Sequence, residues 1–291
     1  MWRILYSALI HTKNLFTSIV GNGFFSNLFD SKSEMSTSNW GLMNTLQFIS
    51  NIFIIKLPLY CPEWVPYPIR ILFFGDNSKY YADDDETKDG ICMIFLNGIL
   101  YNDTTIKQTQ ALLRKMFNRP INILKNASDS IVSDVIETLI GKSTQELDEA
   151  STIALYTICN KLLDEKIDKL IVICHSQGSV IMSNVLKHLY KLGLNKKEYM
   201  EKLEIYSFAT CATKMNYVVD ELPYMEHFAN DNDFVANLGC NCADDIKHLI
   251  SIDGKMQIKR NKSGHMFNTH YIDNFVNDFS DSKLLAYVKN E

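Results

Sequence analysis

Apolar runs alternate with amphipathic stretches along the chain from about residue 70 to its end. Several runs, such as 90–96 and 169–174, are apolar at consecutive positions, which is typical of strands buried on both faces of a parallel sheet. We predict strands at 69–74, 90–96, 121–124, 169–174, 203–209 and 225–229, and a strand or hairpin at 248–258.

Helices are predicted between these strands, and local capping signals help to place their ends. Asp103 is expected to cap the first helix. Ser143-Thr-Gln-Glu146 has the form of a capping box at the start of the second, and Gly193 ends the third with a left-handed cap. We predict helices at 103–117, 143–165, 177–192 and 272–289. The alternation predicts an α/β fold: a mostly parallel central sheet with helices on both faces.

The first 68 residues have a different pattern. Residues 1–29 are mostly apolar, and residues 35–55 carry no charge. The second stretch still contains too many Ser, Thr, Asn and Gln side chains for a bilayer span of roughly 20 residues. Prolines gather between residues 58 and 68 and predict a stiff connector. We therefore expect residues 1–68 to form an apolar N-terminal arm and Pro-rich connector, and residues 69–291 to form the main domain.

The arm has three alternative roles. It can pack on the main domain, contact lipid as a peripheral membrane element, or mediate oligomerisation. A cleavable signal peptide fits poorly, because the first ten residues are not followed by a clear small-residue cleavage site.

Composition narrows the function classes. Hydrophobic residues make up 46% of the chain and charged residues 22%, which excludes a disordered or fibrous protein. The formal net charge of −5 gives no basic surface for nucleic acid. The bias toward Lys, Asn and Ile indicates an AT-rich genome rather than a functional pattern of charges.

The seven cysteines are scattered and odd in number, which favours a reduced, intracellular setting, either cytoplasmic or at a membrane surface. Cys240-Asn-Cys242, with His248 nearby, is at most half a metal site, since no second Cys pair at zinc spacing accompanies it. We expect no metal.

The sharpest chemical feature is Val172-Ile-Cys-His-Ser176-Gln-Gly-Ser179, where an apolar strand passes directly into an amphipathic helix. A serine on such a tight turn exposes its hydroxyl above the sheet edge, and the backbone N–H of Gln177 points toward a developing oxyanion. Small residues are needed two positions on either side of the serine. Gly178 meets that need, and Cys174 is a mild departure from glycine.

At these residues the sequence resembles the α/β-hydrolase superfamily, particularly its lipases and esterases, where His-Ser-Gln-Gly is a frequent nucleophile elbow. The resemblance spans roughly residues 69–291. It implies a serine, an acid and a histidine in that chain order, together with an oxyanion loop after an early strand.

Asn97-Gly98-Ile99 follows the strand at 90–96 and resembles the family's His-Gly oxyanion loop, with Asn97 in the place of the histidine. The resemblance implies that the backbone N–H of Ile99 is the second oxyanion donor. The alternative is an ordinary Asn-Gly turn at a strand end.

For the acid, the segment Asn230-Asp-Asn-Asp233-Phe-Val235 leaves a predicted strand and enters a polar turn. It resembles the segment that holds the acid in fungal-type lipases, which points to Asp233. Asp231 is the alternative, and the whole segment can also be a solvated turn.

The base must follow the acid, which leaves His248, His265 and His270. His248 begins an apolar run and is expected to be structural. Gly264 before His265 gives the loop freedom to bring an imidazole over the serine, so His265 is favoured. His270, which precedes an aromatic residue, resembles the His-aromatic ending of some lipases and is the alternative base. His175 is expected to pack under the elbow.

The residues together predict a serine hydrolase that cleaves carboxyl esters through an acyl-enzyme and without a cofactor. The expected substrates are lipid or other apolar acyl esters. A thioesterase, acyltransferase or peptidase would use the same triad. The non-enzymatic alternative is a hydrolase-like scaffold for binding or assembly. Residues 210–224 or the arm are candidates for a lid.

Overall fold

The computed structural model describes residues 33–34, 50, 64–66, 69, 81–82, 87–99, 101–126, 147–217, 222–241, 247 and 250–288. Most of the predicted arm, the predicted strand at 69–74 after its first residue, the capping box at 143–146, Cys242 and His248 lie outside the described residues. None of the helices in the described ranges combines the length and the apolar composition that a membrane crossing requires.

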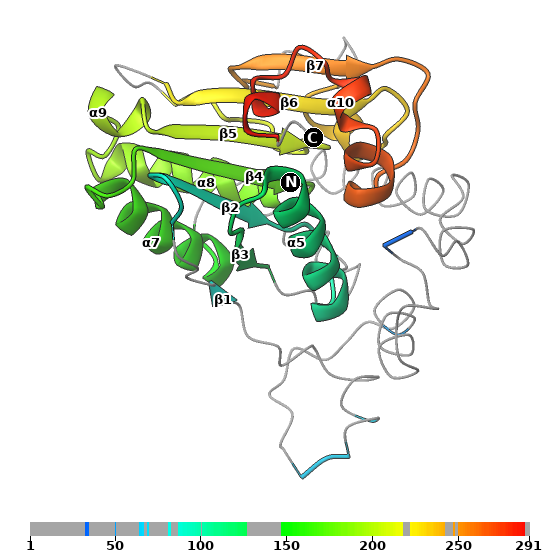
Figure 1. Cartoon of the computed structure of the whole chain (residues 1–291), viewed down its shortest axis with the longest axis horizontal. Helices are drawn as coiled ribbons and strands as arrows, with labels where there is room; N and C mark the ends of the chain where they lie inside the picture. The colour runs from blue at the N-terminus through cyan, green and yellow to red at the C-terminus, as the bar shows by residue number, and fades with distance from the viewer. Residues whose placement is uncertain are drawn as a thin grey trace, which may run out of the picture.

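The described part of the chain forms one seven-stranded sheet in the order β1-β3-β2-β4-β5-β6-β7, which Figure 1 shows from its lower edge to its upper edge. The short edge strand β1 is antiparallel to β3, and the other six strands are parallel. The strands are β1 Tyr81–Ala82, β2 Ile91–Leu96, β3 Asn122–Lys125, β4 Lys169–His175, β5 Leu203–Phe208, β6 Tyr224–Asn230 and β7 Lys255–Lys259. The predicted mostly parallel sheet is therefore confirmed.

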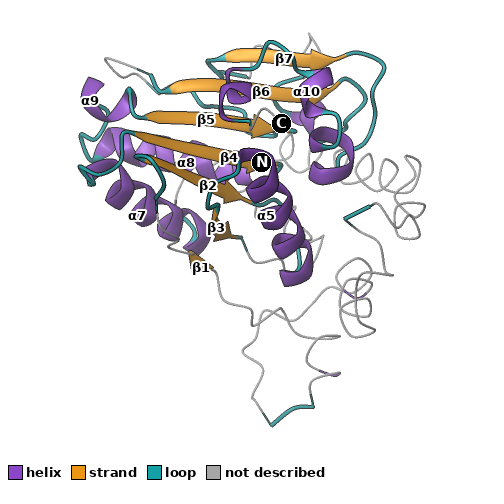
Figure 2. Cartoon of the chain, in the orientation of Figure 1, coloured by secondary structure: helices purple, strands orange, loops and turns teal. Residues whose placement is uncertain are grey.

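Helices cover both faces of the sheet, and each face has its own apolar core (Figure 2). On one face α7 (Glu149–Leu163) packs beside α8 (Gly178–Lys191). On the other lie α5 (Asp103–Phe117) and the C-terminal segments. The remaining helical segments are α9 Lys197–Met200, η2 Ala236–Leu238, η4 Phe267–Ile272, α10 Phe275–Asp278 and η5 Lys283–Tyr287.

The bounds of α5 are those predicted, but its predicted cap was wrong, and so was the predicted start of α7. The α5 cap is Asn102, whose Oδ1 accepts a hydrogen bond from the Thr105 N–H at 2.8 Å, and Asp103 is already helical. Helix α7 begins at Glu149, where Asp148 accepts from the Ser151 N–H at 2.6 Å. Asn102 and Asp148 are both side chains that cap helices well, and each directly precedes the first helical residue. Gly193, with φ of +70°, does follow the end of α8 as predicted.

The continuous final helix predicted for 272–289 was also wrong. The chain instead forms η4, α10 and η5, which are separate short segments. Ser282 interrupts helix formation because its hydroxyl caps η5 through the Leu284 N–H and donates to the Glu226 carboxylate at 2.5 Å. Short polar side chains of this kind compete with the helical backbone for hydrogen bonds. The last strand, β7, occupies only the end of the predicted 248–258 segment.

At one point in the sheet, the connections that leave two adjacent strands run in opposite directions. After β2 the chain crosses to β3, whereas after β4 it crosses to β5 on the opposite side. The carboxyl ends of β2 and β4 therefore flank a topological switch point, where open α/β sheets form their ligand-binding crevice. Asn97 follows β2 and Ser176 follows β4, so the predicted oxyanion loop and nucleophile meet at this point.

Candidate active site

Ser176 occupies a sharp turn between β4 and α8 and has a positive φ of +54°. This conformation is uncommon for a residue with a side chain and is often found at functional sites. The Ser176 N–H donates to the Phe208 carbonyl at 2.9 Å, and its carbonyl accepts from the Ser179 N–H and hydroxyl at 2.9 and 2.7 Å. The Ser179 oxygen also accepts from the Cys211 N–H at 3.0 Å. Hydrogen bonds to Phe208, Ser179 and Cys211 thus stabilise the turn. The role of Ser179 in it was not predicted from the sequence.

Close contacts require glycine at two positions near Ser176: Gly178, two residues after the serine, and Gly98, in the loop after β2. A Cβ at Gly178 would lie 2.5 Å from the Leu96 carbonyl oxygen, and a Cβ at Gly98 would lie 2.7 Å from the Cβ of Ser176. Both distances are far inside van der Waals contact. The loop after β2 therefore passes directly over Ser176.

Cys174 takes the place of the first small residue and is fully buried. Burial raises the pKa of its thiol to about 12, so the group stays protonated and unreactive at neutral pH.

A continuous hydrogen-bonded line joins Ser176, His265 and Asp233. The His265 Nε2 lies 3.0 Å from the Ser176 Oγ, and its Nδ1 lies 3.0 Å from Asp233 Oδ2 and 3.1 Å from Oδ1. The three residues follow β4, β7 and β6, whose carboxyl ends share one edge of the sheet. A ring nitrogen at this distance from a serine hydroxyl can accept its proton.

Asp233 is buried and its oxygens are fully engaged. In addition to His265, Oδ2 accepts from the Tyr271 hydroxyl at 2.6 Å and Oδ1 accepts from the Val235 N–H at 2.9 Å. Burial pushes the pKa of this carboxyl up, but His265 and these donors outweigh it and hold the pKa below its usual value. Asp233 is thus held as an anion beside the imidazole. Tyr271 was not predicted from the sequence, although it adjoins the candidate histidine His270.

The two alternative residues lie elsewhere. His270 Nδ1 accepts from the Met266 N–H at 2.9 Å, and its ring packs where a Cβ on Gly264 would stand. Gly264 has a φ of +100°, which allows the chain to turn sharply just before His265. Asp231 accepts from the Asn261 and Lys262 N–H groups at 2.8 and 3.0 Å. It supports the loop that carries the histidine and makes no contact with the imidazole.

Asn126 links the loop at Asn97 to Gln177 through hydrogen bonds. The Asn97 Oδ1 accepts from the Asn126 N–H at 2.9 Å, and its Nδ2 donates to the Asn126 and Gly98 carbonyls, both at 2.8 Å. The Asn126 amide then donates to the Gln177 side-chain oxygen at 2.5 Å. Asn126 was not predicted, although a polar residue directly after a buried strand at this edge was an available signal. These bonds order the backbone next to Ile99 and Gln177.

His175, beside the nucleophile, packs beneath the turn as expected. Its Nε2 donates to the His265 carbonyl at 2.8 Å, and its Nδ1 lies 3.3 Å from the Tyr101 hydroxyl. Burial, followed by the nearby His265, lowers the pKa of His175 to about 3. The ring is therefore neutral at physiological pH and has no contact with the serine hydroxyl that would make it a base.

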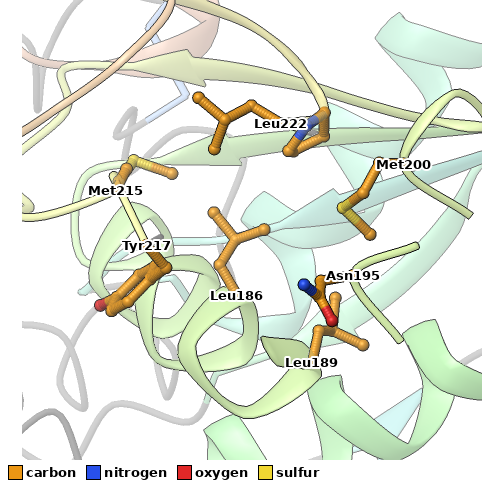
Figure 3. A pocket seen from close by; sticks show the side chains of 8 residues that line it. Leu186, Leu189, Asn195, Met200, Met215, Tyr217 and Leu222 are labelled. Atoms are coloured by element: carbon orange, nitrogen blue, oxygen red, sulfur yellow. The ribbon is translucent and has the colours of Figure 1, made fainter. Parts of the chain in front are cut away.

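Two cavities in the described part of the chain lie away from this site. The first, of about 10 Å³, is lined by residues that include Leu186 and Leu189 of α8 (Figure 3), and it has room for roughly one water molecule. Figure 3 shows Met215, Tyr217 and Leu222 around it, so these residues of the candidate lid 210–224 pack on the helix. The second, of about 410 Å³, is lined by Lys169, Tyr224 and Lys255, at the amino ends of their strands and so at the opposite edge from Ser176.

Within the described ranges, no group of three or more His, Cys, Asp and Glu side chains is arranged to hold a metal ion. Cys240 lies beside Thr210, and burial raises the pKa of its thiol. Its predicted companions Cys242 and His248 are outside the described residues.

Comparisons with known proteins add a distant structural likeness. No protein-family model matches the chain, and no curated protein matches its sequence. A solved structure titled "Structure of arylesterase" is similar with a TM-score of 0.44 and 9% sequence identity, over 87% of this chain and 94% of that one.

Proposed function

We propose that the chain is a serine hydrolase of the α/β-hydrolase type that cleaves carboxyl esters through an acyl-enzyme. One observation carries this proposal: the hydrogen-bonded line from Ser176 through His265 to Asp233, which begins on a strained turn at the topological switch point. The proposal is supported by the distances between the three side chains, which are those that a nucleophile, a base and an orienting acid need.

In the proposed reaction, His265 Nε2 takes the Ser176 proton while the Ser176 oxygen bonds to the ester carbonyl carbon. Asp233 keeps the proton on Nδ1 and stabilises the imidazolium. The tetrahedral intermediate collapses, the carbon–oxygen bond to the alcohol breaks, and His265 gives its proton to the leaving alkoxide. A water molecule, activated in the same way, then releases the acid and restores the serine.

The N–H groups of Gln177 and Ile99 are proposed to hold the oxyanion. Gln177 directly follows the nucleophile at the start of α8, where the partial positive charge of the helix favours an anion. Each such donor contributes about 3 kcal/mol to the stabilisation of the transition state. Asn97 and Asn126 are proposed to orient these donors through the bonds described above.

Covalent labelling with a fluorophosphonate probe tests the proposal. The native chain should be labelled, and Ser176→Ala should not, with circular dichroism showing that both are folded. A folded native chain that is neither labelled nor active on esters would contradict the proposal and favour a hydrolase-like scaffold for binding or assembly.

We also propose an apolar acyl group in the substrate, because residues 1–29 are mostly apolar. A series of p-nitrophenyl esters from acetate to palmitate, with matched thioesters and anilides, measures this preference. Higher kcat/KM on long-chain oxygen esters supports a lipid esterase, whereas preference for thioesters or anilides would identify a thioesterase or peptidase. Liposome flotation and light scattering of the intact chain test the predicted membrane contact or oligomerisation of residues 1–68.

A further inference from the structure

Glu34 connects the N-terminal segment to the loop that carries the candidate base. Its side chain is 4% exposed, and its carboxylate accepts hydrogen bonds from three consecutive backbone N–H groups. The donors are Phe267 at 3.0 Å, Asn268 at 2.5 Å and Thr269 at 3.1 Å. These amides open η4, two to four residues after His265.

The first N–H groups of a helix have no partner within the helix, and η4 has no side-chain cap of its own at Met266. Glu34 supplies that partner from more than 230 positions away in the sequence, since the three bonds span 233 to 235 residues. The carboxylate therefore determines where η4 begins, and with it the path of the chain that leaves His265.

A second line of contacts leads from Glu34 to the same histidine. The Tyr101 hydroxyl is hydrogen-bonded to Glu34 and lies 3.3 Å from His175 Nδ1. His175 in turn donates to the carbonyl of His265. Glu34 thus contacts the His265 segment directly through the amides that follow it, and indirectly through the ring beneath it.

We propose that Glu34 is a positioning residue: an acid contributed by the N-terminal segment holds His265 in line with Ser176 and Asp233. The inference rests on the proposed function, and it places a residue from outside the expected 69–291 domain in support of the active site. It assigns Glu34 itself to the working enzyme.

Burial of the Glu34 carboxyl carries an energetic cost, and the three amide donors offset part of it. Burial raises the pKa of Glu34 to about 7, against the lowering effect of the three amides and of His265. A buried carboxyl is expensive unless its oxygens are satisfied, and an apolar side chain would fill the same space at lower cost. Only an acceptor with two oxygens, however, can orient three amides at once.

Glu34→Gln in the full-length chain tests the inference, because it keeps the size of the side chain and replaces one of the two acceptor oxygens with an NH2 donor. We expect kcat on a short soluble ester to fall about tenfold or more, with KM within about twofold, since misplacement of the base slows chemistry and not substrate binding. The rate of fluorophosphonate labelling should fall in parallel. Hydrogen exchange of a peptide covering residues 265–272 should become faster. The exposed Glu165→Gln is the matched control and should leave all three measurements unchanged.

Tyr101→Phe provides a second variant if Glu34→Gln does not fold. It removes only the hydroxyl shared by Glu34 and His175, and we expect a smaller fall in kcat of about threefold, again with KM unchanged. If the native chain is active and Glu34→Gln has the same kcat, the inference is overturned and the proposed function is left intact. Where Glu34→Gln does not fold, an unchanged kcat in Tyr101→Phe has the same consequence. A folded native chain with no labelling and no turnover overturns the proposed function instead.

Discussion

The imidazole of His175 lies against that of His265, with ring centroids 4.7 Å apart and an angle of 34° between the planes. The same side chain donates to the His265 carbonyl at 2.8 Å. The residue that precedes the nucleophile in the sequence thus holds both the ring and the backbone of the proposed base. This arrangement links the nucleophile turn to the histidine loop without any direct part in proton transfer.

His175→Phe keeps an aromatic ring in this place and removes the hydrogen bond to the His265 carbonyl. We expect kcat to fall about tenfold with little change in KM, which steady-state kinetics will show. Because burial lowers the pKa of His175 to about 3, the residue does not titrate between pH 5 and 9. The shape of the pH–kcat profile over that range should therefore match that of the native chain, and a shifted profile would contradict the assigned neutral state.

His265→Ala and His270→Ala separate the two candidate bases. Loss of His265 removes the group 3.0 Å from the Ser176 hydroxyl, and kcat should fall by about 10³-fold or more. His270 contacts the Met266 N–H, so its loss should affect loop order and lower kcat by less than about tenfold. Fluorophosphonate labelling rates of the two variants provide the comparison, and the reverse ranking would assign the base to His270.

Tyr271→Phe removes the hydroxyl that donates to Asp233 at 2.6 Å. The bond lowers the pKa of that carboxyl, so its loss should raise the pKa of Asp233 and weaken its support of His265. We expect kcat to fall about threefold to tenfold, and the free energy of unfolding in urea to fall by about 1.5–3 kcal/mol, as for a hydrogen bond to a charged group. Tyr190→Phe, in which the altered side chain is 46% exposed, is the control and should change neither value.

Gly98→Ala adds one methyl group directly above the nucleophile. Its Cβ would lie 2.7 Å from the Cβ of Ser176, so the loop must move and the proposed donor at Ile99 moves with it. We expect kcat/KM to fall about 100-fold, while the protein remains folded. Gly193→Ala is the control, because a Cβ there meets no atom within 4 Å. It should cost about 1 kcal/mol of stability through its positive φ and leave turnover unchanged.

His227 is predicted to contribute to loss of stability in acid. It is buried on β6, its Nε2 donates to the Asp253 carbonyl at 2.9 Å, and burial lowers its pKa from 6.5 to about 4. The unfolded chain takes up a proton at this residue near pH 6.5 and the folded chain only near pH 4, so its contribution is present above pH 6.5 and is lost as the pH falls toward 4. The full loss is about 3 kcal/mol.

His227→Gln lacks this titration. The free energy of unfolding of the native chain should therefore approach that of the variant as the pH falls from about 7 to 4, as measured by urea unfolding at each pH. A constant difference between the two proteins across this range would show that His227 does not titrate as assigned.

The central strands β2 and β4 were predictable because each is a local apolar run, and the steric demand of a strand buried on both faces is met by consecutive residues such as Leu170 to Cys174. The two-residue edge strand β1 has no such run and was not predicted. The helix caps were less predictable. Asp103 and Asn102 are both competent caps, and only the packing of α5, with Asp103 in an ion pair with Lys125 at 2.6 Å, distinguishes them. The C-terminal segment was misread because the hydrogen bonds of Ser282 to a buried glutamate on β6 are not visible in the local pattern.

The sequence by itself determined the alternation of strands and helices and the position of Ser176, because a tight strand–turn–helix is specified by neighbouring residues. It narrowed the acid to Asp231 or Asp233 and the base to His265 or His270, because the two members of each pair differ little in local context. Only the tertiary structure decided which members meet, since these contacts join positions 32 and 89 residues apart at one edge of the sheet. The contacts of Glu34 and Tyr271 are equally invisible in local patterns, because only the folded chain brings residues 233 to 235 positions apart, or 38 positions apart, into hydrogen-bonding distance.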